Sequence, residues 1–254
     1  MSEAANADPR RSRAAAVPIP SAEVGRGPGR PGGEESRARI VEAAGQLFAD
    51  RGFDGASVRE LARRAKVNAA AINYHFGGKE ALYHAVLRRL IDDTEPMFTP
   101  MVARLRAGVE TADGDRDALA DLIALFVGGL LSNILSGANF RWQIPIMLRE
   151  FQHPSKEFGM LVRERIDPMH DAVCGIVSAA TGNSPQAPET RLITANIIGQ
   201  CMMFGAARGV VFTRLDWEEY TPDRIGLIIN TVVPRIQAML GLRPVPGPAE
   251  GKSE

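Results

Sequence analysis

The chain has few of the residues that mark secreted or metal-binding proteins. It contains only two cysteines among 254 residues, Cys174 and Cys201, and no C-x-x-C motif. This usage favours buried, reduced thiols in the cytoplasm over a disulfide framework. The four histidines show no metal-ligand spacing such as H-E-x-x-H. We therefore expect no metal, no nucleotide and no other cofactor.

A long hydrophobic run is also missing. The longest apolar stretch, Leu122–Leu135, is interrupted by Ser132 and Asn133. It is shorter than the ~20 residues that a bilayer span requires. The arginines near the N-terminus precede only a short apolar segment, residues 14–19, which contains Pro18 and makes a poor signal peptide. We expect a cytoplasmic protein that makes no membrane contact.

Catalytic motifs are equally scarce. The sequence has no G-x-S-x-G motif and no P-loop, and its carboxylates are spread along helix faces. A formal G-x-G-x-x-G at Gly27, Gly29 and Gly32 follows no strand and is interrupted by prolines, so it does not indicate a dinucleotide site. His170 could act as a general base, but a lone helical histidine is more often structural. We expect that the protein is not an enzyme.

What the chain does have is a core-forming composition and an uneven distribution of charge. Hydrophobic residues make up 45% of the sequence and charged residues 24%, which is typical of a globular protein. The net charge is zero, yet residues 37–90 carry 10 basic and 5 acidic side chains, whereas residues 91–254 carry 15 and 20. A compact basic segment indicates a module that binds a polyanion. The alternative, a helical adaptor that binds only protein, does not explain this segment.

The basic segment shows the signals of short helices joined by tight turns. An apolar stripe from Ile40 to Phe48 recurs at helical spacing, and Gly52 ends that helix. Ser57 and Glu60 form a capping box for a second helix. Asn68 can cap a third helix, residues 69–76, which Gly77 and Gly78 end. Two short helices beside a longer one predict a helix-turn-helix.

The polar groups of the third helix favour a contact with DNA. Its first residues are small, so its N-terminus can approach the bases closely: Ala69, Ala70 and Ala71. Groups that bind phosphate oxygens follow: Asn73, Tyr74, His75 and, at the start of the next helix, Lys79. The free amides at a helix N-terminus also favour phosphate.

Residues 40–79 resemble the DNA-binding domain of TetR-type transcriptional regulators. The resemblance is carried by the run RIVEAAGQLFADRGFDGASVRELARRAKVNAAAINYHFGGKEALY, and above all by its segment YHFGGKEAL. It implies that Ser57, Tyr74, His75 and Lys79 contact phosphates and that Ala69, Ala70, Ala71 and Asn73 lie in or near the major groove. Arg59 and Asn68 complete the predicted DNA-binding set. Lys66 departs from the family pattern, which has a turn glycine there, and Asn73 stands where a tyrosine is usual.

A fainter resemblance to the CecR-like subgroup extends over most of the remaining chain, through Arg149, Glu150, Pro168, His170 and the segment AATG. The second half is predicted to be helical throughout, with one long helix over residues 189–212 and a last helix capped by Thr221 before Pro222. The expected fold is all-α. It comprises a disordered tail (1–35), a three-helix DNA-binding domain (36–93), a helical regulatory and dimerisation domain (94–243) and a disordered end (244–254).

The resemblance implies a homodimer on a near-palindromic operator, released by a small apolar effector, and we expect a repressor. Methionines and aromatic rings suit a deformable pocket. The predicted pocket residues are Phe98, Met101, Leu105, Trp142, Gln143, Met147, Glu150, Phe151, Met202, Met203, Phe204 and Arg208. The predicted dimer contacts are Ala195, Gly199, Met202, Ala206, Val210, Ile225, Ile229, Val232 and Ile236.

Overall fold

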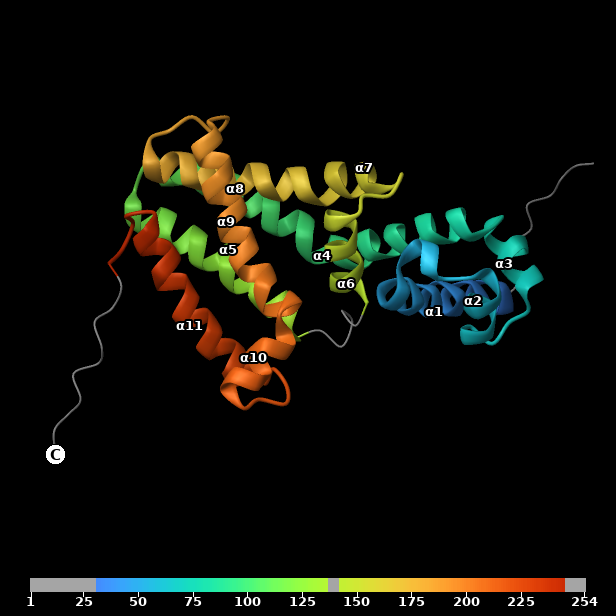
Figure 1. The fold of residues 1–254 in the computed structure, drawn as a ribbon. Helices are drawn as coiled ribbons and strands as arrows, with labels where there is room; N and C mark the ends of the chain where they lie inside the picture. Colours follow the sequence, from blue (N-terminus) through green and yellow to red (C-terminus); the bar gives the residue numbers. More distant parts are fainter. Residues whose placement is uncertain (1–30, 137–141, 245–254) are drawn as a thin grey trace, which may run out of the picture.

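In the computed structural model, residues 31–136 and 142–244 are described, and every regular element within those ranges is a helix (Figure 1). This confirms the predicted all-α fold. The elements are α1 (Pro31–Gly55), α2 (Val58–Arg64), α3 (Ala69–Phe76), α4 (Lys79–Ala112), α5 (Arg116–Ser136), α6 (Gln143–Gln152), α7 (Phe158–Leu161), the π-helix η2 (Val162–Ile166), α8 (Asp167–Thr181), α9 (Pro188–Ala206), α10 (Arg208–Leu215) and α11 (Pro222–Met239). Most of the predicted tails, and Gly27 and Gly29 of the glycine motif, lie outside the described residues.

The first three helices pack around the N-terminal half of α4. Ser57 accepts a hydrogen bond from the Glu60 amide, and the Glu60 carboxylate accepts one from the Ser57 amide, so the predicted capping box is confirmed. Asn68 caps α3 by accepting from the Ala71 amide at 2.7 Å. Lys66 has φ 55, the strained conformation that a turn glycine would adopt without a Cβ clash. Helix α1 begins at Pro31 rather than near Ser36.

Helix α4 joins two separate hydrophobic cores. Its 34 residues rise about 50 Å at 1.5 Å each. Its N-terminal half, as far as Ile91, is buried in the core of the DNA-binding domain, and from Phe98 onward it is buried in the second core. Figure 1 shows α1–α3 around one end of α4 and α5, α8, α9 and α11 around the other.

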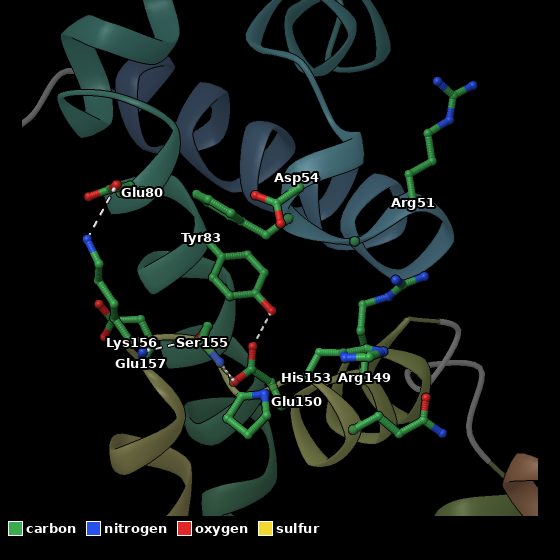
Figure 2. Close-up of a pocket in the computed structure, with 14 residues that line it drawn as sticks. Arg51, Asp54, Glu80, Tyr83, Arg149, Glu150, His153, Ser155, Lys156 and Glu157 are labelled. Carbon is green, nitrogen blue, oxygen red and sulfur yellow. Dashed lines mark hydrogen bonds and ion pairs between the residues drawn. The ribbon is translucent and has the colours of Figure 1, made fainter.

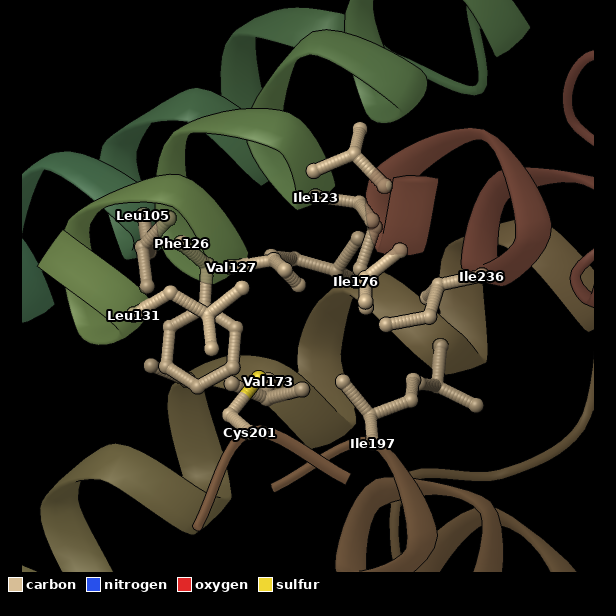
Figure 3. Close-up of a cluster of buried hydrophobic side chains, with 14 of the residues drawn as sticks. Leu105, Ile123, Phe126, Val127, Leu131, Val173, Ile176, Ile197, Cys201 and Ile236 are labelled. Carbon is tan, nitrogen blue, oxygen red and sulfur yellow. The ribbon is translucent and has the colours of Figure 1, made fainter. Parts of the chain in front are cut away.

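Helix α5 lies at the centre of the second core. It packs against α4, α8, α9 and α11, and Figure 3 shows Ile123, Phe126 and Val127 of α5 among side chains of those neighbours. By length and composition alone its segment Arg116–Leu135 could cross a membrane. Helices α4, α8, α9 and α11 cover it on several sides. Both cysteines are buried free thiols, and burial raises the pKa of Cys201 to about 12.

The prediction of one long helix over residues 189–212 is wrong. The structure breaks it at Ala207 into α9 and α10, which are bent by 70° from each other. The Tyr220 hydroxyl donates to the Phe204 carbonyl at 2.7 Å, the oxygen that the Arg208 amide would bind in a continuous helix. The hydroxyl therefore satisfies a carbonyl that the break exposes.

We expect Tyr220→Phe to lower the free energy of unfolding by about 1 kcal/mol, because it removes this hydrogen bond and keeps the ring contact with Phe212. Urea unfolding followed by circular dichroism measures the change. Tyr74→Phe is the matched control, since the Tyr74 side chain is 85% exposed. Equal stability of the two variants would show that the Tyr220 hydroxyl does not stabilise the break.

Candidate DNA-binding surface and ligand cavity

The helix-turn-helix surface consists of the start of α2, all of α3 and the start of α4. Ile72 is fully buried and anchors α3 in the core, while Ala69, Ala70 and Asn73 are exposed on the other side. The Tyr74 side chain is 85% exposed on the same helix.

Cations and hydrogen-bonding groups surround α3. Ser57 and Arg59 are exposed at the start of α2, and Asn68 is exposed at the turn before α3. Lys79 is the first residue of α4. Its ammonium group lies 4.4 Å from the centre of the Phe53 ring of α1, a cation–π contact that favours this position of the lysine side chain. His75 packs edge-on against Tyr74, with ring centres 5.1 Å apart. The structure therefore brings all ten predicted DNA-binding residues onto one end of the molecule.

A second candidate site is an apolar cavity in the other half of the chain. It has a volume of about 460 Å³, within the range typical of small-molecule pockets. Helices α4, α5, α6, α8 and α9 and the π-helix η2 contribute its walls. Its methionines are Met97, Met101, Met147, Met169, Met202 and Met203. Its polar lining residues are Thr94, Asn133, Arg165 and His170.

Family models match both halves of the chain. Residues 40–86 match the model described as "Bacterial regulatory proteins, tetR family", and residues 119–241 match "HTH-type transcriptional dual regulator CecR, C-terminal domain". The dual regulator CecR of Shigella flexneri is 27% identical over 210 residues, which cover 82% of this chain and 92% of that protein. The chain belongs to the TetR family.

Other TetR-family relatives match over shorter segments or in fold alone. The transcriptional activator FasR of Mycolicibacterium smegmatis is 32% identical over 37% of this chain and 39% of its own length. Among solved structures, AibR in complex with isovaleryl coenzyme A and operator DNA matches with a TM-score of 0.53 at 18% identity, over 84% of this chain and all of that one. The hemolysin II regulator HlyIIR matches with a TM-score of 0.52, also at 18% identity, over 78% of this chain and 97% of that one. This TetR-family chain is therefore a DNA-binding transcriptional regulator.

Six of the twelve predicted pocket residues line the apolar cavity: Phe98, Met101, Met147, Phe151, Met202 and Met203. The other six do not. Leu105 is fully buried in the second core, Phe204 packs against that core, and Arg208 lies over the Phe212 ring. Gln143 is buried at the first residue of α6. An apolar or polar residue at helical spacing does not reveal which buried space it faces, and these residues lie outside the lining of the apolar cavity.

Trp142 and Glu150 instead form the junction, the contact of α6 and α7 with α1 and α4. Trp142 lies so close to Gly45 of α1 that a Cβ there would be 2.6 Å from the indole ring, and its Nε1 donates to Glu42 at 3.1 Å. Together with Ile146, Met160 and Leu161, Trp142 is buried in the core of the DNA-binding domain. The second half of the chain thus completes the core of the first half.

Glu150 is 1% exposed and is held by three hydrogen bonds (Figure 2). The Tyr83 hydroxyl of α4 donates to it at 2.6 Å, and the Ser155 amide and hydroxyl donate at 3.2 and 3.0 Å. Burial and the hydrogen bond to Glu150 raise the pKa of Tyr83 above its ordinary value. The junction therefore contains the buried Glu150 carboxylate with its three hydrogen-bond donors, and beside it the packing of Trp142 against Gly45. Around it lies a polar pocket of about 610 Å³.

The predicted dimer residues divide into two groups. Ala195, Gly199, Ala206 and Val210 are exposed, and Met202 is half-buried. Ile225, Val232 and Ile236, by contrast, are buried, and the half-buried Ile229 packs beside them, on the side of α11 that contacts α5. Within the single chain this apolar stripe of α11 packs in the chain's own core, and its part in a dimer stays a prediction.

We expect Tyr83→Phe to lower the free energy of unfolding by about 1.5–3 kcal/mol, since it removes a hydrogen bond to a buried carboxylate. Chemical denaturation measures the loss. Tyr74→Phe again serves as the control, because it removes a solvent-exposed hydroxyl. An unfolding midpoint equal to that of Tyr74→Phe would contradict a structural role of the junction.

Proposed function

We propose that this protein is a ligand-responsive transcriptional repressor, active in the cytoplasm, that binds a near-palindromic operator as a homodimer. A small, mostly apolar effector in the apolar cavity would release it. The observation that carries the proposal is the helix-turn-helix surface, where an 85% exposed tyrosine and exposed alanines lie on α3 and groups able to bind phosphate lie around it.

The proposed DNA contact places α3 in the major groove. Small side chains at Ala69 and Ala70 allow the helix backbone to approach the base edges, where sequence is read. Ser57, Tyr74 and Lys79 would bind phosphates and set the register of the helix in the groove. In a two-fold dimer the two α3 helices would lie about one DNA turn apart, ~34–36 Å, over the two operator half-sites.

The proposed homodimer uses the α9 face, which consists of Leu192, Ala195, Gly199, Met203 and Ala206. These residues are exposed, at 70% for Leu192 and 58% for Met203, and recur at helical spacing. No charged residue occurs between Leu192 and Ala207. An exposed, uncharged apolar stripe with small residues allows two helices to approach closely around a two-fold axis.

The proposed effector response depends on α6, which lies between the cavity and the DNA-binding domain. Ile144, Leu148 and Phe151 line the cavity, whereas Ile146 and Glu150 contact the DNA-binding domain. An effector that binds better to a shifted α6 would favour a state with different α3 spacing and reduce operator affinity. The similar fold of AibR, solved with isovaleryl coenzyme A and operator DNA, supports a scaffold that takes both partners.

Lys79→Ala should weaken DNA binding about equally on all sequences and reduce the slope of log affinity against log salt by roughly one. The matched control is Lys156→Ala, because Lys156 is an exposed lysine outside the helix-turn-helix surface. Fluorescence anisotropy over a salt series, on fragments selected from genomic DNA, measures both variants. Substituting Ala70 with glutamine should instead change which operator bases are tolerated. An unchanged affinity and slope for Lys79→Ala would overturn the proposed surface.

Ala195→Glu should convert the homodimer to monomer at micromolar concentration, raising its dissociation constant at least about 100-fold, because an unpaired charge would be buried between two α9 helices. Ala107→Glu is the control: it introduces the same charge at an exposed alanine on α4. Sedimentation velocity distinguishes the outcomes. A wild-type monomer, or an Ala195→Glu dimer, would remove the α9 face from the proposal.

A further inference from the structure

One wall of the apolar cavity carries a buried cation. Arg165 is 7% exposed and lies on the π-helix η2, a rare element that occurs often at functional sites. Among the described residues that line the cavity there is no carboxylate, and Arg165 and His170 are the basic side chains. Arg165 therefore places a positive charge at this wall.

The guanidinium of Arg165 is fixed by hydrogen bonds to α4 and to its own helix, and it lies over the Phe98 ring, 4.5 Å from the ring centre. Its Nε donates to the Thr94 hydroxyl at 3.1 Å, and its Nη1 donates to the Glu164 carbonyl at 2.7 Å. Its Nη2 donates to the Ile91 carbonyl and, at 2.6 Å, to Glu95. These bonds use four of the five N–H groups of the Arg165 side chain. Because they already fix its rotamer, a ligand that binds to Arg165 loses no further side-chain entropy there.

Glu95 pairs with Arg165 but does not neutralise the cavity. Its side chain is 51% exposed and lies outside the cavity lining, so water screens its contribution. Hydrogen bonds from Thr99 and Arg165 lower the pKa of Glu95, which remains ionised. The pair therefore has its negative end in solvent and its positive end against an apolar space.

His170 adds a second polar group at the same wall. Its Nδ1 lies 3.4 Å from the Cys174 sulfur, and the Cys174 thiol donates to the Thr194 hydroxyl at 3.3 Å. This contact engages one nitrogen of a ring that lines the cavity. Arg165 and His170 thus supply the basic groups of a cavity whose lining is otherwise apolar apart from Thr94 and Asn133.

We propose that the effector is an amphipathic acid, with a single anionic head group against Arg165 and His170 and an apolar body against the methionines. This inference rests on the proposed function and specifies its ligand class. A carboxylate would form a charge-assisted hydrogen bond with the guanidinium, which is about twice as strong as a neutral one. The apolar body would gain from burial, and flexible methionines would adapt to its shape.

The test compares decanoate with decanol, which share an apolar chain and differ in head-group charge. Isothermal titration calorimetry below the critical micelle concentration measures both against the full-length protein. We expect wild type to bind decanoate about 10–100-fold more tightly, as a hydrogen bond to a charged group predicts. Arg165→Gln should reduce this preference to threefold or less. Arg88→Gln is the matched control, because Arg88 also joins α4 to η2, through Glu164, but does not line the cavity.

Equal binding of acid and alcohol by wild type, binding of neither, or an acid preference that survives in Arg165→Gln would each overturn the inference. If Arg165→Gln fails to fold, His170→Phe provides the second variant; it should weaken decanoate binding and leave decanol binding unchanged. Operator release, measured by anisotropy, separates the two proposals. Release by decanol alone would refute the anionic head group and leave the repressor standing, whereas a wild-type protein that binds no operator would refute the repressor whatever the calorimetry shows.

Discussion

The arrangement of the whole molecule depends on the packing of α6 against the DNA-binding domain. Trp142 occupies the space that a side chain at Gly45 would need, and Glu150 is buried under the Tyr83 hydroxyl. Burying a carboxylate costs several kcal/mol unless hydrogen-bond donors satisfy it. Ser155 supplies two donors to Glu150 from the same segment, and Tyr83 of α4 supplies the third only when the two halves of the chain are docked. The orientation of the DNA-binding domain is therefore specified by polar contacts as well as by apolar burial.

This junction makes the two halves of the chain mechanically dependent on each other. Ile146, Met160 and Leu161 belong to the core of the DNA-binding domain although they lie more than 50 positions beyond its end at residue 93. A change on the cavity side of α6 cannot remain local, because the opposite side of the same ten-residue helix is part of that core. Close-packed interiors transmit such a displacement instead of absorbing it.

The local features of the fold could be predicted from sequence, and the long-range ones could not. The capping box at Ser57 and the Asn68 cap involve residues three positions apart, so the sequence contains both partners of each interaction. The partners of Trp142 and Glu150 lie about 100 and 67 positions away, and no periodicity reports such a distance. The apolar stripe on α11 is visible in the sequence, but packing against α5 of the same chain requires the same apolar spacing as packing against a second subunit. Arg165, within the run Arg-Glu-Arg, resembles a solvated charge cluster and gave no signal of burial.

The apolar cavity and the proposed dimer contact share one helix, and this links the two proposals thermodynamically. Ala195, Gly199 and Ala206 line the cavity and also belong to the exposed α9 face. An effector that shifts α9 would change the shape that a second subunit contacts, and a bound subunit would restrict the positions that α9 can adopt. Such coupling is reciprocal, so the free energy by which the effector alters dimer affinity equals that by which the dimer alters effector affinity. Under the two proposals, operator release would have two routes, through α6 to α3 within a subunit and through α9 to the spacing between subunits.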